Sequence, residues 1–203
     1  MKLLYIESKL KNLELNLPIN EIKKLPRRLF LAYSIQYKDL AKSMKILLES
    51  NNIKITNFKQ VLGCSKIKTK EPVLLIGTGR FHATNLYLQA PEIYLLENNK
   101  IIRVNGEEIE RLKIQRKSAL MKFLNAEKIG ILVSTKLGQE NLKQAITLKE
   151  KLKKKGKQAY VFMSNNINIG ELENFNIDSW INTACPGLAL DSNNIVNIHE
   201  IKI

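Results

Sequence analysis

The feature that most constrains this fold is an alternation of strand-like and helix-like segments that occurs twice along the chain. Residues 29–37, LFLAYSIQY, are rich in strand formers, residues 38–52 carry apolar side chains at helical spacing, and residues 53–58 alternate as a strand does. The same order returns in residues 129–139, 141–157 and 158–163. Strands that alternate with helices pair in parallel, with the helices on the faces of the sheet. We therefore predict an α/β fold of two similar units, each a small parallel sheet flanked by helices.

Three helices are expected in this scheme, and each has an apolar stripe or an end signal. The first has Leu40, Met44, Leu47 and Leu48 at helical spacing and ends at Asn51-Asn52, and the last is followed by Gly156. Between the units, residues 107–127 predict a basic amphipathic helix. Its apolar face is expected to hold Ile109, Leu112, Leu120, Phe123 and Leu124, with Arg111, Lys113, Arg116, Lys117 and Lys122 largely elsewhere.

This pattern suggests three parts of the chain. Residues 1–28, with prolines at Pro18 and Pro26, are interpreted as a lead-in or linker. Residues 29–117 would form one α/β domain that contains Cys64, and residues 118–203 a second one that contains Cys185.

Composition and the N-terminal sequence argue against a membrane-spanning chain and against a signal peptide. The 203 residues are 44% hydrophobic and 26% charged, which is ordinary for a globular protein, and no apolar run approaches the roughly 18 residues that span a bilayer. Glu7 and Lys9 interrupt the N-terminus before a signal-peptide core forms. We expect a soluble, cytoplasmic protein. The net charge of +14 fits biased composition with solvated helix faces, an acidic protein partner or RNA, and it does not choose among them.

The chain has two cysteines far apart in sequence, which excludes a disulfide framework. Gly63 precedes Cys64 and Pro186 follows Cys185, so both thiols are expected in turns, where a metal can reach them. The alternative is two small buried hydrophobes, as most free cysteines are. Two cysteines without a CxxC pair do not complete a zinc site or an iron–sulfur cluster by themselves.

Other polar motifs also follow predicted strands, where α/β sheets bind their ligands. They are Ser34 and Gln36, then Gly77, Gly79 and His82 in IGTGRFHATN, then Ser134, Lys136, Gly138 and Gln139 in LVSTKLGQ. Each set has a structural alternative, such as a helix cap or a histidine bonded under a loop. The full GxGxxG pattern of dinucleotide sites is absent, as are HExxH and a Ser/His/Asp set. Asp191 would bind an ammonium group or end a turn.

Taken in order, the motifs SIQY, QVLGC, GTGRFH, STKLGQ and TACPGLALD resemble the diphthamide-biosynthesis family, from about Leu29 to Asp191. These archaeal-type enzymes make 2-(3-amino-3-carboxypropyl)histidine on translation elongation factor 2. The resemblance implies three similar α/β domains that each give one cysteine to a [4Fe-4S] cluster, whose open iron binds S-adenosylmethionine. It also implies that the reduced cluster cleaves the sulfonium to a 3-amino-3-carboxypropyl radical, which adds to a histidine imidazole.

The resemblance assigns roles residue by residue. Cys64 and Cys185 match the cluster ligands of the second and third domains. The S-adenosylmethionine pocket would be lined by Gly77, Gly79, His82, Ser134, Lys136 and Gln139, together with Gln36 and Asp191; no separate catalytic residue is assigned. The chain departs from the family at Tyr37, where histidine is usual, and at Gly187, where arginine is common.

The first domain and its cysteine have no counterpart in the sequence. Our hypothesis is a split transferase, in which a separate polypeptide supplies that domain and docks against residues 1–28. Elongation factor 2 and an electron donor are the other expected partners, and no membrane is expected. The alternatives are a non-catalytic paralogous subunit of the same complex and a basic α/β module that binds RNA.

Overall fold

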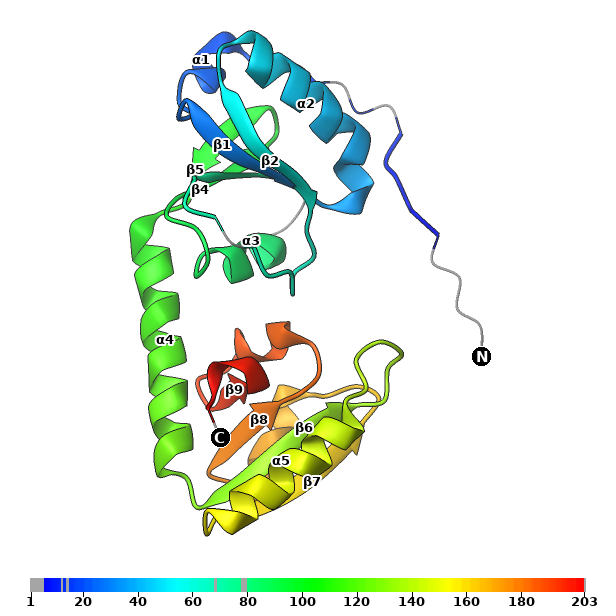
Figure 1. Cartoon of the computed structure of the whole chain (residues 1–203), viewed down its shortest axis with the longest axis vertical. Coiled ribbons are helices and arrows are strands. Elements are labelled where there is room, and N and C mark those ends of the chain that lie inside the picture. Colours follow the sequence, from blue (N-terminus) through cyan, green and yellow to red (C-terminus); the bar gives the residue numbers. More distant parts are fainter. Residues whose placement is uncertain (1–5, 12, 14, 68, 78–79, 203) are drawn as a thin grey trace. The chain divides into compact units, whose positions relative to one another are not determined.

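The computed structural model describes residues 6–202 except 12, 14, 68, 78 and 79, and gives the backbone alone for residues 80–82. The chain divides into two compact units, Met1–Ile109 and Glu110–Ile203, each with its own sheet (Figure 1). The strand orders are β2-β1-β3-β4-β5 and β7-β6-β8-β9. The prediction of two α/β units, each with a small parallel sheet flanked by helices, is confirmed.

The first unit has four parallel strands and an antiparallel fifth. The strands are β1 (Arg28–Tyr33), β2 (Lys54–Gln60), β3 (Val73–Ile76), β4 (Ile93–Glu97) and β5 (Lys100–Arg103), and the helices are α1 (Ile19–Ile22), η1 (Ile35–Tyr37), α2 (Lys38–Ser50) and α3 (Arg80–Leu86). Sequence analysis did not anticipate β5. It folds back on β4 because Asn98 and Asn99 both adopt positive φ, the geometry of a tight hairpin turn.

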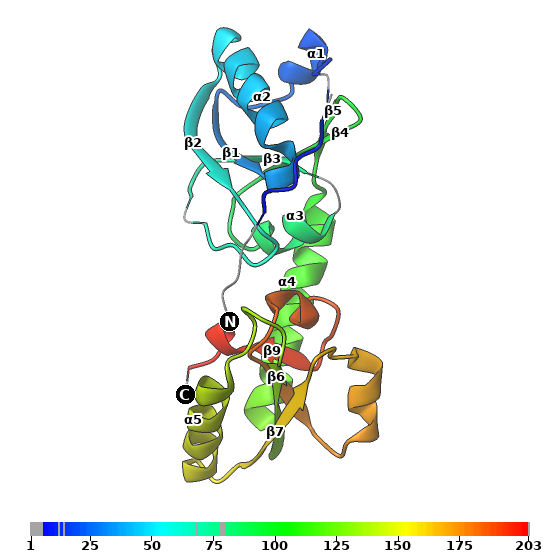
Figure 2. The same ribbon diagram turned by 90° about the vertical axis from the view of Figure 1, so that its right-hand side faces the viewer.

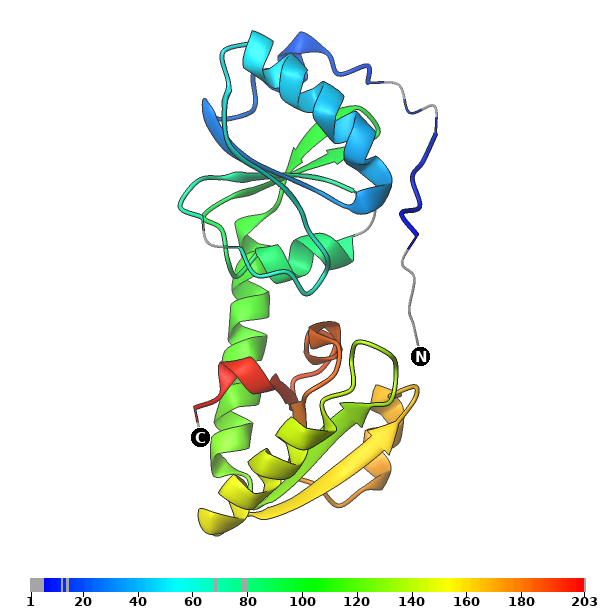
Figure 3. The ribbon, with the colours of Figure 1, turned by 45° about the vertical axis from the view of Figure 1, so that its right-hand side comes forward.

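One core cluster of the first unit lies between the sheet and α2, which runs along one face of it (Figure 3). Met44 and Leu48 of α2 are fully buried against Leu29 and Leu31 of β1, and the other residues of the predicted stripe pack beside them. Residues that precede the sheet belong to this core as well. They are Leu17, Ile22 and Leu25, so part of the segment interpreted as a lead-in packs into the first unit.

The second unit has four parallel strands. Its elements are α4 (Gly106–Asn125), β6 (Lys128–Ser134), α5 (Leu142–Lys154), β7 (Gln158–Ser164), η2 (Ile169–Asn174), β8 (Ser179–Asn182), η3 (Pro186–Ala189), β9 (Ile195–Asn197) and η4 (Ile198–Glu200). Helix α5 and the short helix η2 cover opposite sides of β6 and β7 (Figure 2). Helices α4 and α5 share one core, and no described helix is long and apolar enough to cross a membrane.

Two details of the prediction for α4 are wrong. Leu124, expected on the apolar face, is 56% exposed, and Arg116, expected away from that face, is only 8% exposed. The reason is helical spacing: Leu112, Ala119 and Phe123 are buried, and position 116 falls on the same stripe. The arginine is tolerated there because Glu200 pairs with it.

Candidate functional site

The polar motifs lie at the carboxyl ends of the parallel strands. In the first unit Gln36, Cys64 and Gly77 follow β1, β2 and β3, and in the second unit Ser134 ends β6 while Cys185 follows β8. Within a parallel sheet these ends share one edge, which is the edge where α/β folds bind ligands. The placement agrees with the strand ends expected from sequence.

One pocket in the second unit brings four of the predicted residues together. Ser134, Lys136, Gln139 and Cys185 line a pocket of about 270 Å³, and the other lining residues are Asn165, Asn166, Ile167, Ala184 and Leu188. Lys136 carries the one charge among these described lining residues. An ammonium group among amides and a thiol favours a ligand with an anionic group, such as a carboxylate. Asp191 is exposed and lies outside this set.

The loop after β6 is shaped by its own short-range bonds. The buried Ser134 hydroxyl accepts a hydrogen bond from the Lys136 N–H at 3.2 Å, and the Gln139 N–H donates to the Lys136 carbonyl at 3.0 Å. Gly138 sits at φ +77°, a backbone geometry that favours glycine. The turn therefore keeps Lys136 and Gln139 beside the strand end.

Cys185 follows β8 and precedes η3, with its side chain half-buried. Strand β8 ends at Asn182, three residues before the cysteine. The chain leaves the sheet there because the Asn182 side chain binds the backbone of Ala184 and Cys185. The thiol consequently lies in a loop at the pocket and not in the ladder.

Cys64 is exposed, in a turn that α3 and its following residues support. The Ser65 hydroxyl accepts a hydrogen bond from the Leu62 N–H at 2.8 Å. The Ser65 carbonyl accepts from the side-chain amides of Asn85 and Gln89, at 3.0 and 3.1 Å. The thiol next to this anchor is open to a metal or to another polypeptide.

Gly77 lies beside Ser34, which directly follows β1, and a larger residue there would require Ser34 to shift. A Cβ at this position would lie 3.1 Å from the Ser34 Oγ, and Ser34 is 5% exposed with no hydroxyl partner among the described residues. Gln36 is exposed, and its carbonyl accepts the Leu10 N–H at 3.0 Å. Gly79 and the side chain of His82 lie outside the described residues.

The donor set fits an iron–sulfur cluster in part, because thiolates are the usual ligands of such clusters. Cys64 is exposed and Cys185 is half-buried, and each lies outside the strands and helices of its own unit. No group of three or more His, Cys, Asp and Glu side chains that could hold a metal occurs in the described part of the chain.

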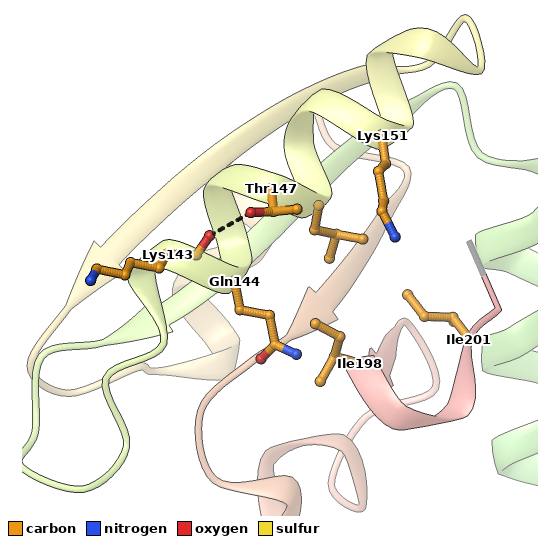
Figure 4. A pocket seen from close by; sticks show the side chains of 7 residues that line it. Lys143, Gln144, Thr147, Lys151, Ile198 and Ile201 are labelled. Carbon is orange, nitrogen blue, oxygen red and sulfur yellow. Dashed lines mark hydrogen bonds between the residues drawn. The ribbon is translucent and has the colours of Figure 1, made fainter.

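A larger pocket of about 420 Å³ lies between α5 and the C-terminal residues, and it contains none of the predicted site residues. Gln144, Ile198 and Ile201 point toward this space, while Lys143 points away from them (Figure 4). The Thr147 hydroxyl donates to the Lys143 carbonyl at 3.0 Å, so it is engaged within its own helix (Figure 4).

Sequence analysis missed several polar residues around Cys185. Asn182 and Asn197 end β8 and β9 in the interior, Arg116 is buried on α4, and Asn165 and Asn166 line the pocket. One signal was available: Asn182 interrupts an otherwise apolar strand, and a buried amide requires hydrogen-bond partners. Nothing local marked Arg116, because its partner Glu200 is 84 positions away.

Comparison with known proteins places this geometry in context. The family model described as "Putative diphthamide synthesis protein" matches residues 1–202. The 2-(3-amino-3-carboxypropyl)histidine synthase of Pyrococcus horikoshii is 31% identical over 85% of this chain and 54% of its own length. The protein called subunit 1 of this synthase in Yarrowia lipolytica is 30% identical over 65% of this chain and 32% of its own.

Solved structures agree with these relatives. The crystal structure of Dph2 from Pyrococcus horikoshii superposes with a TM-score of 0.72 at 28% identity, and covers 88% of this chain and 57% of that one. The structure of the same protein with a 4Fe-4S cluster superposes equally well, at 27% identity. The chain spans about half the length of the Pyrococcus relative that it matches. The resemblance seen in the motifs is confirmed, and the chain belongs to the family of diphthamide synthesis proteins.

Proposed function

We propose that this chain is a component of the transferase that moves a 3-amino-3-carboxypropyl group from S-adenosylmethionine to a histidine of elongation factor 2. One observation carries the proposal: Cys185 lines the same pocket as Ser134, Lys136 and Gln139. A thiol for a metal and polar groups for a charged co-substrate then meet at one strand edge. The names of the synthase relatives and the cluster in the Dph2 structure support this choice.

In this proposal Cys64 and Cys185 supply two thiolate ligands of a [4Fe-4S] cluster. A third thiolate comes from outside these 203 residues, because the chain contains two cysteines. The chemistry supplied by the bound cluster is one-electron reduction of the sulfonium. The task of this chain is to hold its two thiols in place and to orient the co-substrate.

The pocket residues have distinct tasks. The Lys136 ammonium would pair with the α-carboxylate of S-adenosylmethionine, and the Gln139 side-chain amide is available to its amino and carboxylate groups. On the first unit, Gly77 permits close approach of a ligand to the backbone, and Gly79, His82 and Gln36 remain proposed contacts, as does Asp191 on the second unit. Elongation factor 2 and an electron donor are the proposed partners, in the cytoplasm, where translation takes place.

Anaerobic reconstitution tests the cluster. The chain is mixed with iron, sulfide and a candidate polypeptide that carries the third cysteine, and iron content and absorbance near 400 nm are measured. We expect a cluster in the mixture and its loss in both Cys64→Ser and Cys185→Ser. A cluster that forms equally well in both variants, or none with any candidate polypeptide, contradicts the proposal.

Turnover tests the co-substrate pocket and separates a catalytic subunit from a non-catalytic one. With dithionite, we expect the assembled complex to cleave S-adenosylmethionine and to label elongation factor 2. Lys136→Ala should raise the KM for S-adenosylmethionine about tenfold, the effect of one lost charge-assisted bond. Lys143→Ala, which removes a lysine outside this pocket, is the matched control. A complex with a full cluster but no cleavage would identify a non-catalytic subunit.

A further inference from the structure

The loop that carries Cys185 is held by a buried amide. Asn182 is 1% exposed, and its Nδ2 donates to the Cys185 carbonyl and to the Asn197 Oδ1, both at 2.8 Å. Its Oδ1 accepts the Ala184 N–H at 2.9 Å. A carbonyl only accepts and an N–H only donates, so these backbone partners fix which way the amide points. Every hydrogen of this amide is committed to the loop or to Asn197.

Asn197 extends these contacts to the far side of the cysteine. Its Nδ2 donates to the Pro186 carbonyl at 3.2 Å, directly after Cys185. Its own N–H donates to the Glu200 carboxylate at 2.7 Å. The two asparagines end neighbouring parallel strands, β8 and β9, so the loop is tied to the rigid edge of the sheet.

Helix α4 holds the other end of the loop. The Arg116 guanidinium binds both oxygens of Glu200, with Nε to Oε1 at 3.0 Å, and also donates to the Ala189 carbonyl. Gln115 donates to the Leu190 carbonyl at 3.1 Å. Glu200 thus joins the asparagine pair to Arg116 in one continuous network that contacts the backbone of residues 184–186 and 189. Gln115 adds a separate bond to residue 190.

The network surrounds the cysteine but holds backbone groups, which leaves the half-buried thiol on the pocket wall. The held groups are the N–H of Ala184 just before the cysteine and the carbonyls of Cys185 and Pro186, so side chains fix the backbone at three successive residues around the thiol. The turn of Cys64 is different, since the side-chain hydrogen bonds of its described residues hold the Ser65 carbonyl and the Leu62 and Ile67 N–H groups. These bonds come from Ser65 itself and from Asn85 and Gln89, and Cys64 is exposed.

We propose that Asn182, Asn197, Glu200 and Arg116 form a positioning network for Cys185, which fixes the thiol at the wall of the Lys136 pocket before any metal binds. Its use in holding a cluster rests on the proposed function, whereas the fixed position of the thiol is a property of this chain alone. Such preorganisation lowers the conformational cost of ligation.

Thiol alkylation in the full chain tests the network without iron or co-substrate. Iodoacetamide labelling of Cys185 and Cys64 is followed in the same molecules by peptide mass spectrometry. The Asn182→Asp variant loses the Nδ2 donor, so the Cys185 carbonyl and the Asn197 Oδ1 face a carboxylate instead. We expect the Cys185 rate, relative to Cys64, to rise about tenfold, the factor for one or two lost hydrogen bonds. Gln115→Ala keeps a good helix residue and should raise it about threefold through the loss of one bond.

The matched control is Asn85→Asp, which removes a donor from the Ser65 carbonyl beside Cys64. It should raise the Cys64 rate and leave the Cys185 rate unchanged. The proposal is overturned if the ratio of the rates stays at the native value in folded Asn182→Asp, or if both rates rise together as in general unfolding. If circular dichroism shows Asn182→Asp unfolded, Asn197→Asp, which removes the donor to the Pro186 carbonyl, decides by the same criterion.

Failure of this inference and failure of the proposed function are distinguishable. An unchanged alkylation ratio, with a cluster that forms normally, contradicts the positioning network and leaves the proposed function intact. A raised ratio, with no cluster under any condition, supports the positioned thiol and contradicts the iron–sulfur function.

Discussion

The two units arrange four strands in the same way but place their cysteines after strands that are not equivalent. In both, the first strand is flanked by the second on one side and the third on the other: β2-β1-β3-β4 and β7-β6-β8-β9. Cys64 follows β2, an edge strand, whereas Cys185 follows β8, an inner strand. The repeat therefore supplies a scaffold with an open strand edge, and the position of the thiol on that edge is specified separately in each unit.

The cores differ in a matching way. Phe30 lies four residues before Ser34 and pairs with Val73, while Gly130 lies four residues before Ser134 and pairs with Trp180. In the first unit the larger side chain, Phe30, is on the first strand, whereas in the second unit the larger one, Trp180, is on the third strand. Volume is thus conserved across the pair of strands rather than at each residue.

The largest expected loss of stability comes from removing the buried charge of the second unit, Arg116. Arg116→Met in the second unit leaves Glu200 without its partner and should lower the free energy of unfolding by about 3 kcal/mol. Trp180, the single tryptophan, reports on this unit by fluorescence during urea denaturation. Lys113→Met, which breaks an exposed pair with Glu110 on the same helix, should change stability by less than about 0.5 kcal/mol. Equal effects would contradict the structural role of Arg116.

The exchanged core pair predicts the next effect in size. A Cβ at Gly130 would lie 2.2 Å from the Trp180 ring, so Gly130→Ala should cost about 2 kcal/mol in chemical denaturation followed by circular dichroism. Gly106→Ala, where nothing lies within 4 Å of the added carbon, is the control and should be close to neutral. A tolerated alanine at 130 would mean that the two cores do not divide their volume as described.

A smaller effect on stability is expected at the C-terminal ends of α2 and α5. Helices α2 and α5 both end in a Schellman motif, with Asn52 at φ +61° in the first unit and Gly156 at φ +78° in the second. Asn52→Gly should raise stability by about 0.5 kcal/mol, and Gly156→Asn should lower it by a similar amount. Opposite signs in thermal melts would show that the side chain of Asn52 has another role.

The smallest expected effect is a pH dependence. Hydrogen bonds from Lys24 and the Ile101 N–H hold the pKa of Glu21 below its usual value, and the N–H groups of Lys128 and Glu127 do the same for the pKa of Asp178. Both acids are then more ionised in the folded chain. Their stabilisation is complete above the unfolded pKa values of about 4 and is lost as the pH falls through the lower folded values.

In Glu21→Gln and in Asp178→Asn, the free energy of unfolding should fall less steeply between about pH 5 and pH 2 than in the native chain. Denaturation midpoints across this range measure the effect. An unchanged pH profile in both variants would show that other carboxylates control acid unfolding.

Much of the fold could be predicted, because periodicity and end signals are local. The stripe of Met44 and Leu48 and the positions of Asn52 and Gly156 are readable from neighbouring residues. β5 was missed because its four residues gain stability only from the hairpin turn before them. Arg116 was misplaced because a charge on a buried stripe is explained only by a distant partner.

The candidate site was predictable to a similar extent. Strand ends and motif order indicated Ser134, Lys136, Gln139 and Cys185, and these four line one pocket. Asn165 and Asn166 were missed because they follow a strand whose end carries no glycine or cysteine. Asp191 was assigned to the site by the family resemblance; it lies outside the residues that line this pocket and stays a prediction.

The unequal strand positions of the two thiols bear on the history of the repeat. If one unit is a copy of the other, no single ancestral cysteine accounts for both thiols, since Cys64 and Cys185 follow strands that are not equivalent in the two sheets. At least one of the two thiols was then acquired after the duplication.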